Sequence, residues 1–244
     1  MHLLRITLFG LFSGLIGTGL GGLSAFLVRN MSNRFLSSIL EFSAGLMTAV
    51  VCFELLPEAF NLGGTLFTFT GILSGIMIVV LIENALKHSD MFGSSSGSGL
   101  RKTGVLMAIA IALHNLPEGF AVGSGFEVSL SLGFTITAAI IIHDIPEGIA
   151  MAVPMRVGGF SRIRAFLYTL LSGVPMGIGA LLGAALGKIS DLLTAACLGF
   201  AAGAMLYIIF GELLPESKRL YFGRLSSLAN VLGILCGIIV SINN

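Results

Sequence analysis

The stretch His114-Asn115-Leu116-Pro117-Glu118-Gly119 decides the fold of this chain, because it returns 29 residues later as His143-Asp144-Ile145-Pro146-Glu147-Gly148. Each copy lies in the middle of an apolar segment that is long enough to cross a membrane. A charged side chain at the centre of a bilayer costs about 2.5 to 3.5 kcal/mol. The two motifs therefore predict a compensating partner for their charges inside a membrane protein.

The composition is that of an integral membrane protein. The 244 residues are 55% hydrophobic and 10% charged, with a mean hydropathy of +1.01, whereas soluble domains carry about 25% charged residues. We expect one all-α transmembrane domain over residues 1–244, with eight spans of about 20 residues each. The expected spans cover residues 6–28, 36–60, 64–86, 103–126, 129–153, 165–187, 192–215 and 225–242, and a flexible cytoplasmic loop covers 87–102.

The basic residues predict the orientation of these spans. Of the 13 Lys and Arg residues, all except Arg5 and Lys188 fall in the four odd-numbered connections. Cytoplasmic connections of membrane proteins are enriched in Lys and Arg. We therefore expect a multi-pass protein of the cell (inner) membrane with both termini outside. We interpret the first span as a retained helix rather than a signal peptide, because its removal would destroy the even number of spans.

A second repeat links the second and seventh spans. Ala-Gly-Leu-Met and Glu-Leu-Leu-Pro-Glu, within residues 44–58, return at the same spacing within residues 202–216, and only Leu46 is changed, to Ala204. Spans two and seven cross the membrane in opposite directions, and so do spans four and five. This pattern predicts an inverted-repeat bundle of 3+2+3 helices, in which spans one to three mirror spans six to eight. Substrate sites of such folds lie near the midplane, between the repeats.

The doubled motif has the chemistry of a metal site. Residues four apart share a helix face, so each copy places an imidazole beside a carboxylate. Pro117 and Pro146 lack an N–H, which bends each helix and frees the carbonyls of Leu113 and Ile142. Nitrogen and oxygen ligands without a thiolate suit Zn²⁺, Fe²⁺, Mn²⁺, Co²⁺ or Cd²⁺. The candidate metal ligands are His114, Asn115, Glu118, His143, Asp144 and Glu147.

Two pairs of glutamates flank the expected site. Glu54 and Glu58 lie near the outer end of the second span, and Glu212 and Glu216 lie near the inner end of the seventh. We interpret the first pair as the entrance and the second pair as the exit of a cation path. The alternative is that these glutamates simply meet water at span ends. Glu41, near the inner start of the second span, is interpreted as interfacial rather than transporting.

The two central motifs, the repeated Glu-Leu-Leu-Pro-Glu and the segment from Leu171 to Gly183 together resemble the ZIP (Zrt/Irt-like) family of divalent metal transporters, in its prokaryotic branch. The resemblance spans all eight expected helices. It implies a 3+2+3 arrangement, movement of metal into the cytoplasm, and the same six ligands at the transport site. Many ZIP proteins carry a glutamate in helix 6 that helps to hold a second metal, and Met176 stands at that position here. Because a thioether does not replace a carboxylate for a borderline ion, we expect one central metal ion.

We therefore predict a transporter that imports Zn²⁺ or a similar cation, with the metal as substrate, no cofactor and no nucleic-acid partner. The alternative is an intramembrane metal-dependent hydrolase, in which metal-activated water attacks a lipid or a peptide. No additional acid–base pattern such as His-Glu-x-x-His accompanies the motifs, and the repeat symmetry favours transport over an enzyme. The preferred ion, the driving force, the net direction and the oligomeric state, for which a homodimer is one candidate, stay open at this point.

Overall fold

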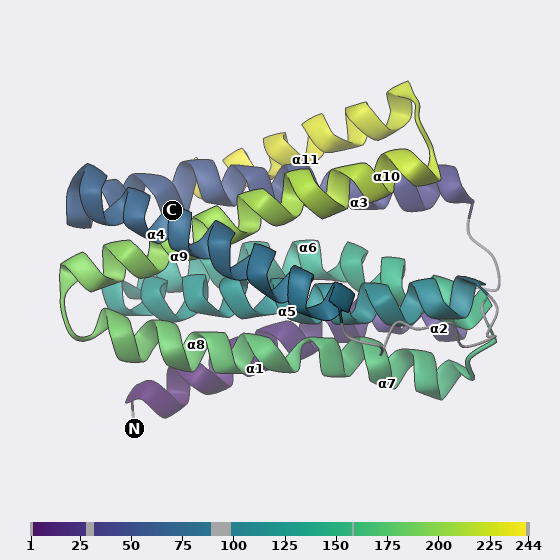
Figure 1. The fold of residues 1–244 in the computed structure, drawn as a ribbon, viewed down its shortest axis with the longest axis horizontal. Helices are drawn as coiled ribbons and strands as arrows, with labels where there is room; N and C mark the ends of the chain where they lie inside the picture. The colour runs from purple at the N-terminus through teal and green to yellow at the C-terminus, as the bar shows by residue number, and fades with distance from the viewer. Residues whose placement is uncertain (1, 28–31, 89–98, 158, 243–244) are drawn as a thin grey trace.

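The computed structural model describes residues 2–27, 32–88, 99–157 and 159–242. Within these ranges the chain is almost entirely helical and contains no β-strand. The helices follow the long axis of one bundle (Figure 1). The predicted all-α fold class is therefore confirmed.

The described chain forms a succession of α-helices, two of which continue through short π-helical turns. The elements are α1 (His2–Gly22), α2 (Ser24–Leu27), α3 (Asn33–Val50), η1 (Val51–Leu55), α4 (Leu56–His88), α5 (Gly99–Val128), α6 (Leu130–Val157), α7 (Arg162–Ser172), α8 (Val174–Gly187), α9 (Asp191–Ile208), η3 (Ile209–Leu213), α10 (Leu214–Leu220) and α11 (Arg224–Ile242). Because α4 extends to His88 and α5 begins at Gly99, both edges of the expected loop 87–102 are helical; residues 89–98 lie outside the described residues.

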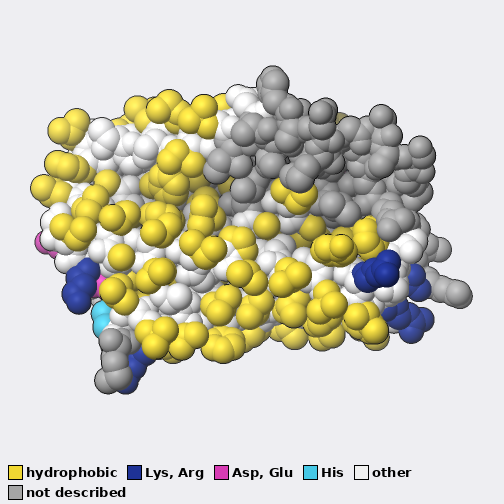
Figure 2. Space-filling view, turned by 60° about the horizontal axis from the view of Figure 1, so that its bottom comes forward, with side chains coloured by type: hydrophobic (Ala, Val, Ile, Leu, Met, Phe, Trp, Pro, Cys, Tyr) yellow, Lys and Arg dark blue, Asp and Glu magenta, His cyan; other side chains and the backbone are white. Residues whose placement is uncertain are grey.

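Five segments of the described chain are long and apolar enough to cross a membrane. They are His2–Leu27, Asn33–Leu81, Leu130–Val153, Arg162–Gly187 and Asp191–Leu220. Hydrophobic side chains cover the middle of the face shown in Figure 2, with Lys and Arg gathered towards its two ends. Helix α1 begins and helix α11 ends at the same end of the bundle (Figure 1). These features are those of a multi-pass membrane protein.

The longest of these segments folds back on itself at Gly64. Its 49 residues would extend about 74 Å as one helix, more than twice the hydrocarbon thickness of about 30 Å. Gly64 has φ 61° and ψ −167°, a conformation that glycine adopts at little cost because it has no Cβ. The chain therefore reverses its direction, and α3 and α4 run antiparallel (Figure 1).

Two π-helical turns interrupt the bundle at related positions. They are η1 at residues 51–55 and η3 at residues 209–213, which are separated by the same 158 residues as the second sequence repeat. A π turn widens a helix locally and is frequent at functional sites. Each of these turns contains or adjoins one of the glutamates of the Glu-Leu-Leu-Pro-Glu segments. The repeat thus extends from the sequence to the local backbone geometry.

The contact between α1 and α6 positions the centre of the molecule. A Cβ atom added at Gly21 would collide with the carbonyl of Ile145, and one added at Gly148 would collide with the backbone of α1. Small residues let helix backbones approach closely in membranes. The same approach places Asp144 against Gly17, where a Cβ atom would overlap the Asp144 side chain. Asp144 is therefore held beside α1 in the interior of the bundle.

Candidate metal centre

Helices α5 and α6 carry the two copies of the doubled motif. Pro117 lies inside α5, and Pro146 lies within the bounds of α6. The side chain of His114 lies outside the described part of the structure. The other five predicted ligands all have fully buried side chains: Asn115, Glu118, His143, Asp144 and Glu147.

Three of these residues form a compact cluster, which we call the central cluster: Glu118, His143 and Asp144. One potential ligand atom from each lies within 4.8 Å of the others. Nε2 of His143 is 2.9 Å from Oε1 of Glu118 and 3.5 Å from Oδ1 of Asp144. Ligands at about 2.0–2.2 Å from Zn²⁺ would be about 3.3–3.6 Å apart in a tetrahedral site. The separation of His143 and Asp144 lies in this range, and the 2.9 Å between His143 and Glu118 is a hydrogen bond that a bound ion would replace.

Several buried oxygen atoms around the central cluster accept no hydrogen bond. They are Oδ1 of Asn115, Oε2 of Glu118 and both carboxylate oxygens of Asp144. The large majority of buried polar atoms have a hydrogen-bond partner, and a buried charge without a partner is strongly unfavourable. A bound cation would satisfy these oxygens without any donor. The unsatisfied oxygens make this cluster a candidate metal site.

Asn115 is oriented by the break between α7 and α8. Its Nδ2 donates a hydrogen bond to the carbonyl of Ser172 at 2.6 Å. Ser172 ends α7, and α8 begins after Gly173 with Pro175 in its first turn. Because the amide nitrogen is engaged there, the oxygen of Asn115 is the atom left to accept a ligand.

Ser43 reaches the motif from a third helix, α3. Its hydroxyl lies 3.1 Å from Oε1 of Glu147 and 3.2 Å from the carbonyl oxygen of His143, and it donates to them. A hydroxyl carries one proton, so it serves these two acceptors alternately. Glu147 is thus oriented from α3, as metal ligands commonly are by partners outside the coordination shell.

Neither Ser43 nor Ser172 was identified from the sequence. Ser43 is one small polar residue in an apolar span, and such residues occur in many positions of membrane helices. Ser172 contributes a backbone carbonyl, which no residue type reveals. The available signal was the Ser-Gly-Val-Pro segment that begins at Ser172, because a glycine and a proline close together favour a helix break.

Met176 lies next to the motif of α5. It is fully buried in α8, and a Cβ atom at Gly119, the residue after Glu118, would collide with its backbone carbonyl. The hydroxyl of Ser13 lies 3.2 Å from the Met176 sulfur and donates to it. The thioether therefore contacts α1, and the expectation of one central metal ion stays a prediction.

Three glutamates of the expected cation path, Glu54, Glu58 and Glu216, have described side chains, and these lie outside the central cluster. Glu54 is half-buried in η1, and Glu58 is half-buried in the first turn of α4. Glu216 accepts two hydrogen bonds from Arg219, at 2.8 and 2.7 Å. The side chain of Glu212 is not among those described. Glu216 is therefore already paired with a cationic side chain.

Comparison with known proteins identifies relatives over nearly the whole chain. The model of the family described as ZIP Zinc transporter matches residues 87–242. A Zinc transporter ZupT of Akkermansia muciniphila is 35% identical and covers 99% of this chain and 98% of its own length. Proteins of the same name from Corynebacterium glutamicum (38% identity, 85% of this chain and 86% of the relative) and Streptococcus mutans (31%, 98% and 96%) are also similar.

Proposed function

The chain belongs to the ZIP family of zinc transporters, and we propose that it imports Zn²⁺ or a similar divalent cation through a site between α5 and α6. It is a transporter and not an enzyme, so the alternative of an intramembrane hydrolase is set aside. The observation that carries the site is the pair of carboxylates in the central cluster: Oε2 of Glu118 and both oxygens of Asp144 are buried without a hydrogen-bond donor.

In this proposal all six residues of the doubled motif bind the ion, including His114. Imidazole, carboxylate and amide ligands suit zinc and its neighbours in the periodic table. The side chains of Asn115 and Glu147 are each held from a separate helix, which restricts the positions of their ligand atoms. One ion binds at the centre, because Met176 offers no carboxylate for a second.

We place this site on the axis of an inverted 3+2+3 bundle with both termini outside. In such a repeat the second span corresponds to the seventh and the third to the eighth. The contact of α3 with α11 then corresponds to the contact of α9 with α4. The same repeat relates the contact of α1 with α6 to that of α8 with α5, and η1 to η3. Basic residues then occupy the cytoplasmic connections, as the positive-inside rule requires for an inner-membrane protein.

We further propose that cations enter past Glu54 and Glu58 and leave past Glu212 and Glu216. Carboxylates at each end attract a divalent cation and raise its local concentration. Exit past Glu216 requires its ion pair with Arg219 to open, and that pair is exposed enough to be screened by solvent.

The test is metal uptake into sealed proteoliposomes. Asp144→Asn keeps the shape of the side chain and removes its charge, and we expect it to abolish Zn²⁺ flux. The matched control is Glu127→Gln on α5, because Glu127 pairs with His2 at 3.2 Å outside the central cluster. Wild-type flux in Asp144→Asn would contradict the site. Competition by Fe²⁺, Mn²⁺, Co²⁺ and Cd²⁺ in the same assay ranks the ions.

The number of central ions needs a separate measurement. Metal per protomer in the purified protein, determined by elemental analysis after removal of loosely bound metal, should equal one for the wild type and fall in Asp144→Asn. Two tightly held ions that both disappear with Asp144→Asn would contradict the role given to Met176.

A further inference from the structure

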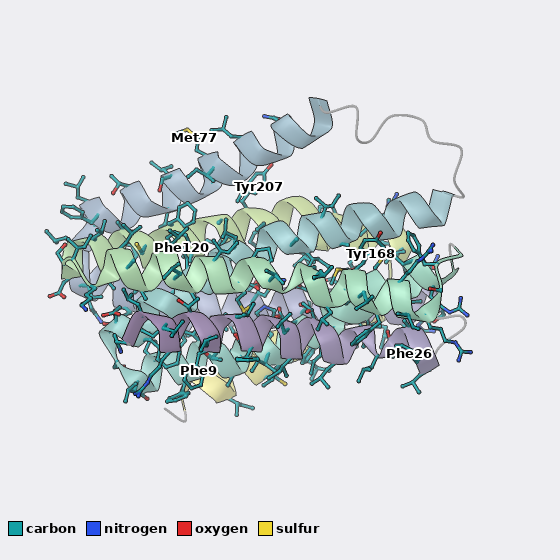
Figure 3. All side chains as sticks on the ribbon, turned by 90° about the horizontal axis from the view of Figure 1, so that it is seen from below. Phe9, Phe26, Met77, Phe120, Tyr168 and Tyr207 are labelled. Carbon is teal, nitrogen blue, oxygen red and sulfur yellow. The ribbon has the colours of Figure 1, made fainter. Side chains whose placement is uncertain are left out.

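A groove of about 380 Å³ lies between α1 and α6, outside the central cluster. Its walls are apolar side chains of both helices: Leu8, Phe9, Phe12 and Ile16 of α1, and Phe134 and Ile141 of α6. Figure 3 shows Phe9 on the side of α1 that faces away from α8. The aromatic rings of Phe9 and Phe134 meet edge to face, with centroids 5.8 Å apart. The groove therefore has a firm aromatic wall at bilayer depth.

The two uncharged polar residues in the groove, Ser13 and Thr137, offer no donor to a ligand. The hydroxyl of Ser13 is directed to the carbonyl of Gly10 at 2.8 Å and to the sulfur of Met176. The hydroxyl of Thr137 donates to the carbonyl of its own helix, four residues earlier, at 2.6 Å. With both hydroxyl protons engaged, the body of the groove suits a hydrocarbon chain.

One end of the groove carries a positive charge, from Arg5. Arg5 is exposed, and no carboxylate pairs with it within the part of the chain that the structure describes. The nearby acidic side chain of Glu127 is instead engaged with His2. Arg5 therefore presents an available guanidinium, which binds phosphate groups well.

The length of the groove matches one leaflet of a bilayer. From Arg5 to Ile16 the α1 helix advances about 16 Å at 1.5 Å per residue, close to half of the roughly 30 Å hydrocarbon core. The charged end lies at the start of α1, and the apolar end lies towards the middle of the bundle. A phospholipid has the same arrangement, with a charged headgroup at one end and an acyl chain that spans one leaflet.

We propose that this groove binds an anionic phospholipid, with the lipid phosphate at Arg5 and one acyl chain along Phe9, Phe12 and Ile16. The acyl chain fills a space that would otherwise be empty at membrane depth. The guanidinium gives the site its preference for an anionic headgroup. The site lies on the outer side of the helix pair that also holds Asp144 against Gly17.

Native mass spectrometry of the detergent-purified protein tests this proposal. The protein is titrated with phosphatidylglycerol and with phosphatidylcholine of the same acyl chains. We expect phosphatidylglycerol to be retained about fivefold better, the effect of about one basic residue at a membrane surface. Arg5→Gln should remove this preference. Lys188→Gln, which changes the other outward cation outside the groove, should keep it.

A second variant tests the acyl-chain part of the site. Leu8→Trp fills the groove from a position that is 40% exposed, so the fold should tolerate it, and retention of both lipids should fall. Glycerol phosphate, which has the headgroup charge without chains, should not compete. Equal retention of the two lipids by the wild type, an unchanged preference in Arg5→Gln, or unchanged retention in Leu8→Trp would each overturn the proposal. So would a dimer that excludes lipid from the groove.

Discussion

Two buried polar clusters among the described residues differ in whether their hydrogen bonds are complete. The first is the central cluster of Glu118, His143 and Asp144. The second, which we call the serine cluster, consists of Glu41, Ser37, Ser217 and Ser226 and joins α3 to α10 and α11. In the serine cluster Ser37 lies 2.8 Å from the Ser217 hydroxyl and 2.7 Å from that of Ser226, and Ser217 donates to Glu41 at 3.2 Å.

The difference teaches how to recognise a ligand site in a membrane protein. Every described side-chain oxygen of the serine cluster is either bonded or within reach of solvent, whereas the central cluster keeps buried oxygens without donors. A complete hydrogen-bond network fastens helices to one another, and an incomplete one is stable only when something else binds. Glu118 and Asp144 each keep at least one buried oxygen without a donor, whereas the buried Glu41 accepts a hydrogen bond from Ser217 and keeps none. This difference marks the central cluster, and not the serine cluster, as the candidate ligand site.

The largest effect should follow from Glu118→Gln in the central cluster. We expect Zn²⁺ flux to fall more than the 10- to 100-fold that is typical for residues that only orient a metal ligand. The metal-free protein should keep or gain thermal stability, because the change removes one of two like charges buried in the central cluster, and the amide oxygen of Gln can still accept from His143. Flux and melting temperature are measured on one preparation. Normal flux with a lowered melting temperature would contradict this role, because it would show that the central cluster supports the fold and does not bind the transported ion.

Ser43→Ala should give the next largest effect. Loss of the hydroxyl frees Glu147 from α3, and we expect metal affinity to fall about 10- to 100-fold. The measurement is the Zn²⁺ concentration at half-maximal uptake. Ser38→Ala is the matched control, because Ser38 lies on the same helix, is half-buried, and donates to the Arg34 carbonyl of its own helix rather than to the motif. Equal effects of the two substitutions would contradict an orienting role for Ser43.

Glu41→Ala should affect stability rather than transport. Ser217 would lose an acceptor inside a buried network, which costs about 1–3 kcal/mol. We expect a lower melting temperature in detergent, and unchanged Zn²⁺ flux per folded molecule. A loss of flux without a loss of stability would place the serine cluster on the transport path and remove the distinction between the clusters.

Arg219→Gln should have the smallest effect. Its pair with Glu216 is exposed, with 66% of the Arg219 side chain accessible, and exposed ion pairs contribute about 0–1 kcal/mol. We expect unchanged stability, and a small increase in flux if release past Glu216 requires that pair to open. A clear decrease in flux would instead show that Arg219 supports the exit.

The sequence predicted the helical fold and the residues of the candidate site because both follow from patterns along the chain. Apolar length gave the helical segments, and the doubled motif gave residues that α5 and α6 bring together as Glu118 and His143. The repeat at 158 residues anticipated that the second and seventh spans share local structure. These signals depend on neighbouring residues and on spacing along one chain.

The missed features depend on packing between distant segments. The burial of Glu41 requires Ser217, which lies 176 residues away in sequence, so its position near a span end suggested an interfacial residue. The support of Glu147 by Ser43 joins residues 104 apart. The π turns depend on which backbone N–H and C=O groups pair along the helix. No residue type in Val-Cys-Phe-Glu-Leu specifies that pairing.

The glycine contacts between α1 and α6 have a mechanical consequence. No side chain separates the two backbones where Gly21 meets Gly148, and at Gly17 the Asp144 side chain packs directly against the α1 backbone. A slip of one residue would bring Ile16 or Thr18 into the space that Gly17 leaves for Asp144. We therefore expect the two helices to move as one rigid body, so that any movement of Asp144 along the membrane normal moves α1 as well.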